Sequence, residues 1–467
     1  MSITGAVMVP HPPLIIPEVG RGQEKAIQAT IDAYHQAARR LAAWKPDTVV
    51  VLSPHSVMYA DYFHISPGTG AEGDFGRFRA PHAKVRVTYD RELVRLICQE
   101  ADRADVPAGT MGEEDRQLDH GTMIPLWFLN QYDRNYQVVR IGLSGLPFSA
   151  HYRLGQCIQR AAERSEKRIA VIASGDLSHR LTKDGPYGFQ EEGPAYDRRI
   201  MDVMGSGAFG GLFDFSEEFC EKAAECGHRS FVIMAGALDS LAVKAERLSH
   251  EGPFGVGYGI CTYEADGPAP GRDFLRQQEE KEREALEERK RKEDPYVRLA
   301  RQTIEAWVRG CAGRTEKRIA VPEGLPEEML ARRAGVFVSL KEDGRLRGCI
   351  GTISPVRGSI AEEIMENAVS AACRDPRFHP VEPEELDRLV YSVDVLGKPE
   401  EISSKEELDV KRYGVIVSRG ARRGLLLPNL EGVDTVEEQI DIARQKAGIP
   451  EDAENIRLER FEVVRHF

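Results

Sequence analysis

Short apolar runs alternate with longer amphipathic segments through the first half of the chain. The runs TVVVLS and RIAVIAS are continuous and rich in Val and Ile, which is typical of strands buried on both faces. Helical periodicity lies between such runs, as at 24–44 and 150–164. This alternation predicts an α/β fold, with a central sheet flanked by helices. The expected strands are 3–9, 48–53, 84–89, 136–143, 168–173 and 254–263.

The second half has a different pattern, because its apolar runs come in pairs. AGVFVSL and LRGCIGTI are separated by KEDGR, which predicts a hairpin turning at Asp343-Gly344. GVIVS and GLLLP flank RGARR and predict a second hairpin. Periodic helices are expected at 359–374 and 435–447, and Thr435 with Glu438 forms a capping-box pattern at the start of the latter. Hairpins beside separate helices predict a smaller α+β domain.

A charged run separates the two patterns. Between positions 276 and 294, 15 of 19 residues are charged, with mixed sign and without Gly or Pro. Glu, Lys and Arg are good helix formers, so the run predicts a solvated connector helix. It follows a break rich in Gly and Pro at 266–271. We therefore expect a first domain over 1–265, a charged helical linker over 266–294 and a second domain over 295–467.

Composition narrows the class of protein. A length of 467 residues fits two or three domains, and 41% hydrophobic residues are enough for packed cores. The net charge of −12 argues against bulk nucleic-acid binding. No apolar stretch reaches membrane-spanning length. Prolines interrupt the apolar N-terminal segment, which does not have the pattern of a signal peptide. Eight scattered cysteines without a C-x-x-C pair exclude a zinc ribbon and favour a reducing cytoplasm.

Histidines follow several of the expected strands of the first domain. His11, His55 and His179 each come shortly after an apolar run, and His120 lies in the segment LDHG. Ligands of open α/β sheets bind outside the carboxyl ends of the strands, so these residues are expected to meet at one edge. A single histidine there is more often structural, but four together predict a shared metal or catalytic site. Neutral imidazole suits iron, zinc and copper.

The segments that carry these histidines resemble a known family. VPHPP (9–13), SPH (53–55), LDHG (118–121) and GDLSH (175–179) are similar to class III extradiol dioxygenases, and most similar to their LigB-like/Memo-like branch. In that family two histidines and a glutamate bind non-haem Fe(II), and a further histidine handles protons. The resemblance implies that His11 and His55 bind the metal, with zinc and copper as alternatives to Fe(II). It implies His179 as the acid/base and His120 as a substrate-contacting or supporting residue.

The third ligand is sought late in the first domain, ahead of its last strand. Glu225 is the expected carboxylate there. Memo-like proteins have a cysteine near this position, which makes Cys226 the alternative. The other candidate carboxylates are Glu191, Glu192 and Glu251.

The implied chemistry is ring opening of a catecholic or phenolic substrate by O₂. Such a metal orients both reactants and lowers the pKa of a bound hydroxyl. His179 would take up and return the second hydroxyl proton. Asp176, three residues earlier, is the candidate to orient its imidazole.

The second domain carries its own signature. LRGCIGT (346–352) and RDPRF (374–378) closely resemble the AMMECR-type domain. Cys349 is either a nucleophile or a small residue buried in a packed strand. Arg347 is a candidate for binding an anion, and the alternative is that it belongs to an ordinary charged surface. The same two interpretations hold for Arg345, Arg374 and Arg377.

The order of the two domains resembles protein A of the AmmeMemoRadiSam system. That resemblance implies partner proteins of the radical SAM and Memo-like kinds, besides a small aromatic substrate and O₂. Two functions follow: a cytoplasmic iron-dependent oxidoreductase with an AMMECR-type accessory module, or a redox scaffold that keeps a metal pocket without dioxygenase activity. The nature of the third ligand is the feature that separates the two interpretations.

Overall fold

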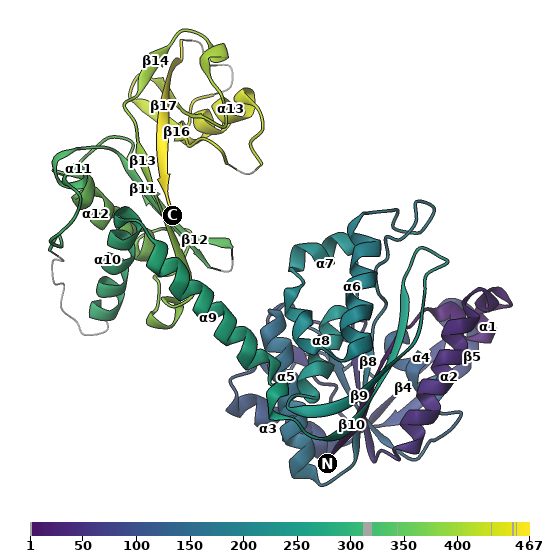
Figure 1. Ribbon diagram of the computed structural model, residues 1–467. Coiled ribbons are helices and arrows are strands. Elements are labelled where there is room, and N and C mark those ends of the chain that lie inside the picture. The colour runs from purple at the N-terminus through teal and green to yellow at the C-terminus, as the bar shows by residue number, and fades with distance from the viewer. Residues whose placement is uncertain (1, 312–319, 343, 431, 451–452, 454) are drawn as a thin grey trace. The chain divides into compact units, whose positions relative to one another are not determined.

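The computed structural model describes residues 2–311, 320–342, 344–430, 432–450, 453 and 455–467. The chain divides into two compact units, Met1–Lys281 and Glu282–Phe467. The division falls inside the helix α9 (Phe274–Lys292), which contains most of the charged run. Figure 1 shows the elements of each unit.

A six-stranded mixed sheet forms the centre of the first unit, with the strand order β7-β2-β8-β1-β10-β9. The first four strands in this order are parallel, whereas β10 runs antiparallel to β1 and β9 antiparallel to β10. The α/β fold expected from the alternating pattern is thus confirmed. The strands are β1 (Ile3–Val9), β2 (Thr48–Ser53), β7 (Gln137–Gly142), β8 (Ile169–Ser174), β9 (Leu241–Glu251) and β10 (Tyr258–Pro268).

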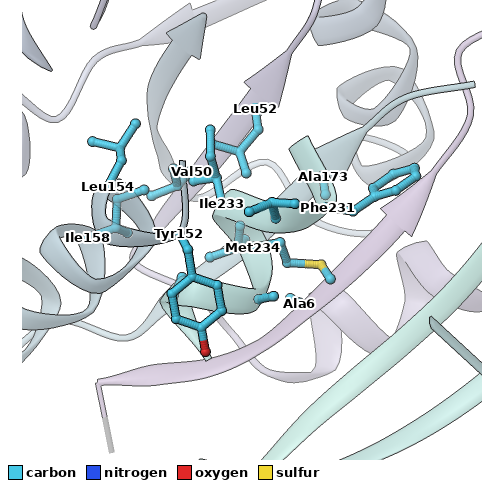
Figure 2. Packing of buried hydrophobic residues seen from close by; sticks show 14 of the residues in the cluster. Ala6, Val50, Leu52, Tyr152, Leu154, Ile158, Ala173, Phe231, Ile233 and Met234 are labelled. Carbon is cyan, nitrogen blue, oxygen red and sulfur yellow. The ribbon is translucent and has the colours of Figure 1, made fainter. Parts of the chain in front are cut away.

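Helices cover both faces of this sheet because its central strands are apolar on both faces. Val50 and Leu52 of β2 pack into one core together with α5 and α8, as Figure 2 shows. Val49 and Val51 face a second core that contains side chains of α2 and α4. The larger helices of the unit are α2 (Gln28–Ala43), α3 (Arg91–Arg103), α4 (His120–Leu129), α5 (Phe148–Ser165), α6 (Glu192–Ser206), α7 (Glu217–Ala223) and α8 (His228–Ala237).

The sequence pattern missed some elements of the first unit. The expected strand 84–89 is part of a hairpin made by β4 (Gly70–Phe75) and β5 (Ala80–Thr88). β9 was not expected, since charged residues interrupt it and much of it is half-buried or exposed. The small elements are η1 (Pro13–Ile15), α1 (Pro17–Gly20), η2 (Gln23–Ile27), β3 (Phe63–His64), η3 (Gly76–Phe78), β6 (Ala108–Gly109), η4 (Phe209–Asp214) and η5 (Pro270–Arg272).

The second unit is built on an antiparallel sheet of seven strands. Its main order is β12-β11-β13-β17-β15-β16, and β14 also pairs with β17. Both expected hairpins are present, β11 with β12 and β15 with β16. Asp343, the first residue of the expected turn, lies outside the described residues. The strands are β11 (Val336–Glu342), β12 (Arg345–Gly351), β13 (Leu389–Leu396), β14 (Glu400–Ile402), β15 (Tyr413–Arg419), β16 (Arg422–Leu426) and β17 (Arg457–His466).

Helices pack on this sheet in two places, which confirms the α+β architecture. α10 and α12 share one core with β11 and β13, and α13 packs in another core with β15 and β16. Thr435 caps α13 and forms the predicted capping box with Glu438. The helices are α10 (Pro295–Cys311), α11 (Glu327–Ala331), α12 (Ile360–Cys373), η6 (Pro383–Glu385), η7 (Lys405–Glu407) and α13 (Val436–Ala447). Within the described ranges, no helix combines the length and apolarity needed to cross a membrane.

Candidate metal centre

Two histidines and a cysteine gather at one edge of the first sheet. Nε2 of His11 lies 3.0 Å from Nε2 of His55 and 3.6 Å from Sγ of Cys226. The three potential ligand atoms all lie within 4.8 Å of one another. Residues up to 215 positions apart in the sequence thus form a compact donor set.

The sheet topology explains why the histidines meet. β1 and β2 are parallel neighbours of β8, so their carboxyl ends lie at the same edge. His11 and His55 each follow their strand after a single proline, Pro10 or Pro54. This is the edge at which open α/β sheets bind ligands.

Cys226 reaches the histidines because two backbone segments approach each other closely. Gly175 follows β8, and Gly227 precedes α8. A Cβ atom on Gly175 would lie 2.1 Å from the Cα of Gly227, so glycine is needed there. The adjacent backbone N–H of Asp176 donates to Sγ of Cys226 at 3.3 Å, which fixes the sulfur beside the histidines.

Polar neighbours hold His11 in place. Its Nδ1 lies 2.9 Å from Oγ of Ser174, the last residue of β8, and its backbone N–H donates to Oδ1 of Asp176 at 2.7 Å. With Nδ1 engaged, Nε2 is the ring atom directed to His55 and Cys226. Partners of this kind orient metal-ligating histidines.

A second set of polar neighbours supports His55. Its backbone N–H donates to Oγ of Ser53, which donates to Oδ1 of Asp119 at 2.5 Å. Asp119 also caps α4 and lies 3.7 Å from the guanidinium of the buried Arg140. Burial alone would raise the pKa of Asp119, but the hydrogen bonds from Ser53 and Thr122 and the charge of Arg140 lower it. A carboxylate is therefore fixed next to the His55 segment.

The donor set fits a transition-metal ion. On a tetrahedral ion of zinc size, two imidazole nitrogens would be about 3.4 Å apart, and a nitrogen and a thiolate sulfur about 3.6 Å. The separation of Nε2 of His11 and Sγ of Cys226 equals the second value, and the two nitrogens are slightly closer than the first. Two of the three separations are therefore close to those of a bound ion, and the third, between Nε2 of His55 and Sγ of Cys226, is at most 4.8 Å.

Burial sets the protonation of these ligands. Burial, followed by the neighbouring His55, lowers the pKa of His11 well below its ordinary value, so the imidazole is neutral. Burial, followed by the carboxylates of Asp176 and Glu225, raises the pKa of the Cys226 thiol. Metal ligation requires neutral imidazole and deprotonated sulfur, so a bound cation would release the proton of Cys226.

His120 and His179, the two expected catalytic histidines, both lie near this group. The ring of His120 stacks on the ring of His55, with their centroids 4.1 Å apart. It also packs edge-on against the ring of Phe78, with a centroid distance of 5.6 Å. Burial, followed by His11 and His55, lowers the pKa of His120 to about 3. His179 interacts electrostatically with His11, and its ring packs edge-on against Tyr187 at 5.2 Å.

Nδ1 of His179 is buried and has no hydrogen-bond partner among the described residues. Asp176 therefore does not orient the imidazole as the sequence had indicated. Its carboxylate accepts the backbone N–H of His11 instead.

Glu225, the expected third ligand, is not part of the donor set. Its Oε2 accepts the backbone N–H of His228 at 2.5 Å at the start of α8. Burial raises the pKa of Glu225 to about 7. The backbone hydrogen bonds from His228 and Gly227 and the charge of Arg229 lower this pKa by a smaller amount. The geometry thus favours Cys226, the alternative that the sequence had left open, over Glu225.

The other carboxylates considered from the sequence lie elsewhere. Glu251 accepts hydrogen bonds from the backbone and hydroxyl of Thr30. Glu191 and Glu192 lie at the start of α6, where Glu192 is 3.8 Å from Lys222. Sequence reasoning missed Ser53 and Ser174, although their place as the last residues of β2 and β8 was a usable signal.

In the second unit, the two candidate residues occupy different environments. Cys349 is half-buried, and its sulfur accepts a hydrogen bond from Oγ of Ser339 at 3.2 Å. Arg347 forms a two-point ion pair with Glu385, with Nε to Oε1 at 2.7 Å. Arg347 is thus ion-paired with a carboxylate. Cys349 instead lines a cavity in the second unit.

Comparison with known proteins identifies the class of this fold and site. Residues 5–261 match the family described as the catalytic LigB subunit of aromatic ring-opening dioxygenase. The match covers more than half of the chain, so the chain belongs to the LigB family. Residues 297–466 match the AMMECR1 family, so an AMMECR1 domain follows the LigB domain.

Individual relatives cover one or both domains. Protein CA_C1420 of Clostridium acetobutylicum is 41% identical over 474 residues, covering 100% of this chain and 99% of the relative. A Thermotoga maritima protein is 54% identical over 175 residues, which is 37% of this chain and 98% of the relative. The solved uncharacterized protein PH0010 from Pyrococcus horikoshii is 36% identical with a TM-score of 0.33, covering 36% of this chain and 88% of that one.

Proposed function

We propose that residues 1–281 form a metal-dependent oxidoreductase that opens catecholic or phenolic rings with O₂. The observation that carries the proposal is the cluster of His11, His55 and Cys226 at the ligand-binding edge of a LigB-type sheet. Because ring opening requires a redox-active ion, iron is the proposed metal and copper the alternative. A thiolate ligand is compatible with both, and also with zinc.

The bound metal would supply a Lewis acid that acidifies a substrate hydroxyl and an open position for O₂. The protein's own residues would do the rest. His179 is the proposed general base, since its buried Nδ1 has no partner within the described part of the chain. His120, kept neutral by burial, would hydrogen-bond to a substrate hydroxyl. Phe78 and Tyr187 contact these two imidazoles and would pack against an aromatic ring.

Oxygen uptake tests this function directly. The chain is purified without oxygen, loaded with Fe(II) and mixed with a panel of simple catechols in an oxygen electrode. We expect substrate-dependent uptake and a ring-opened product, both lost in His11→Ala and His55→Ala. Wild-type chain that holds iron but consumes no oxygen with any catechol would count against the proposal.

A second candidate function is favoured by the cysteine itself. A thiol in place of the expected carboxylate suits a centre that holds zinc or copper without ring opening. The two-domain order resembles protein A of the AmmeMemoRadiSam system, so this candidate is a metal-holding scaffold that recruits radical SAM and Memo-like partners. Zinc in the purified chain, without oxygen uptake after iron loading, is the result that would favour it. Both candidates are proposed to work in the cytoplasm, where free thiols such as those of this chain persist.

A further inference from the structure

The second unit contains a large cavity that is independent of the metal centre. Its volume is about 1020 Å³, and all the residues that line it belong to the unit Glu282–Phe467. Ligand pockets typically measure about 300–1,000 Å³. The cavity therefore has room for a small organic molecule.

Much of the cavity wall is apolar. Phe337, Ile353, Leu389, Tyr391 and Leu425 line it together with further leucines. These residues come from β11, β13 and β16 and from the segment after β12. An apolar body, aliphatic or aromatic, would be desolvated favourably against them.

The charged part of the wall is strongly cationic. Seven lysine and arginine side chains line the cavity, against only two carboxylates, Glu293 and Asp394. Both carboxylates are already neutralised, Glu293 by Arg301 at 2.9 Å and Asp394 by Arg465 at 2.7 Å. Four of the seven cations are paired as well: Lys290 with Glu287, Arg377 with Asp375, Arg423 with Glu459 and Arg465 with Asp394.

Some of these cations have no partner of their own. Lys341 and Lys446 line the cavity, and neither takes part in an ion pair found among the described residues. They therefore remain available to an anion that enters the cavity, whereas the charge of Arg465 is already balanced by Asp394.

Cys349 is within electrostatic reach of three cationic side chains, two of which are already paired with carboxylates, Arg377 with Asp375 and Arg465 with Asp394. Lys446, Arg377 and Arg465 each interact electrostatically with Cys349. The guanidinium of Arg377 also donates to the carbonyl oxygen of Cys349 at 3.1 Å. The backbone N–H of Cys349 donates to Oδ2 of Asp375 at 2.9 Å, which fixes the position of the strand.

We propose that this cavity binds an amphipathic organic anion, with its carboxylate near Cys349 and Lys446 and its apolar body against the leucines. The site goes beyond the ring-opening function and does not depend on it, because every residue involved lies in the second unit. Charge complementarity selects the anion, and the apolar wall selects a ligand that carries a hydrocarbon body.

Alkylation of Cys349 by two small reagents tests the cationic part of the site. Iodoacetate is anionic and iodoacetamide is neutral, and in both reactions the thiolate sulfur bonds to the reagent's methylene carbon while iodide leaves. Rates at Cys349 are read by peptide mass spectrometry in the full-length chain. The quantity compared is the rate of alkylation by iodoacetate divided by the rate by iodoacetamide. We expect this ratio to be at least about threefold higher at Cys349 in the folded chain than at the same thiol in the urea-unfolded chain.

Matched variants and ligands complete the test. Lys446→Met should lower the ratio about two- to threefold, while Lys411→Met, an exposed lysine outside the cavity, should leave it unchanged. Octanoate should slow the alkylation of Cys349 severalfold, and 1-octanol at the same concentration should not. Equal ratios in folded and unfolded chain, equal effects of the two lysine variants, or equal protection by octanol would each overturn the proposal.

Discussion

At the scale of single residues, the position of Cys226 depends on a backbone contact that only glycine permits. Replacing Gly175 by alanine would place a Cβ atom 2.1 Å from the Cα of Gly227, so the loop that carries Cys226 must move. We expect Gly175→Ala to lose most of its bound metal and to destabilise the first unit by about 1–3 kcal/mol. Metal analysis and thermal unfolding measure the two effects.

Gly271→Ala is the matched control, because a Cβ atom there meets nothing within 4 Å and the backbone is not in the left-handed region. It should retain both metal and stability. Full metal occupancy in Gly175→Ala would show that the close approach of the two loops is not needed for the site.

The serine behind His11 is expected to tune the metal. Ser174→Ala removes the hydroxyl 2.9 Å from Nδ1 of His11, which frees the ring to rotate. Loss of such an orienting partner typically costs about 10–100-fold in metal affinity, and competition with a chelator measures it. Ser206→Ala, whose hydroxyl bonds only to carbonyls of its own helix, is the control. Unchanged affinity in Ser174→Ala would contradict the orienting role.

His179 is expected to act on protons and not on the metal. His179→Ala should keep the metal and lose about 10²–10⁴-fold in turnover, the usual contribution of general acid–base catalysis. Metal content and oxygen uptake of the same preparation separate the two effects. Loss of the metal would make His179 a ligand, and full activity would leave it with a structural role.

The sequence predicted that His11 and His55 meet at one edge of the sheet, and it left the third ligand open between Glu225 and Cys226. His11 and His55 follow strands whose apolar runs mark them in the sequence, so their common edge follows from topology. Glu225 and Cys226 are adjacent, and which of them faces the histidines depends on how Gly175 and Gly227 pack. A contact between residues so far apart leaves no local pattern.

At the scale of elements, one carboxylate ties two helices together. The buried Glu100 of α3 accepts hydrogen bonds from Arg164 of α5 at 2.6 Å and from Arg103 at 2.7 Å. Burial alone would raise the pKa of Glu100, but the hydrogen bond from Arg164 and the charge of Arg103 outweigh it and lower the pKa.

Because its folded pKa is depressed, Glu100 stabilises the fold above its unfolded pKa of about 4.3, and this contribution is lost as the pH falls through the folded value. Glu100→Gln should therefore lower the free energy of unfolding by about 1–2 kcal/mol at pH 7 and by less in acid. Urea unfolding of both chains across this pH range checks the trend. A destabilisation that is constant with pH would contradict it.

Elements with local signals agree best with the sequence. β1 and β2 have the predicted bounds because each is a continuous apolar run, and α13 begins where its capping box predicted. β9 could not be predicted, since its pairing with β10 stabilises a segment whose own pattern is mixed. The expected strand 254–263 likewise begins later, at Tyr258.

At the scale of the whole molecule, the two units should fold independently. The division lies between Lys281 and Glu282. This position is inside the linker 266–294 that the sequence predicts between the domains 1–265 and 295–467. Fragments 1–281 and 282–467 should each unfold in a single cooperative transition, measured by calorimetry. A fragment that does not unfold cooperatively would mean that the units share a core.

The choice of boundary matters for the second unit. Leu286 and Glu293 line its cavity, and Glu293 is buried against Arg301. A fragment that begins at residue 295 should therefore be less stable than 282–467, although the charge run looked like a linker in the sequence. Equal stability of the two fragments would show that this part of α9 adds nothing to the second unit.

The central claim is that His11, His55 and Cys226 hold a metal ion, and metal content measured after purification without oxygen tests it most directly. Cys226→Ala and Glu225→Gln change adjacent residues, only one of which belongs to the donor set. We predict about one metal ion per chain in the wild type and in Glu225→Gln, and strong loss in Cys226→Ala. Loss in Glu225→Gln together with full occupancy in Cys226→Ala would contradict the account and restore the carboxylate as the third ligand.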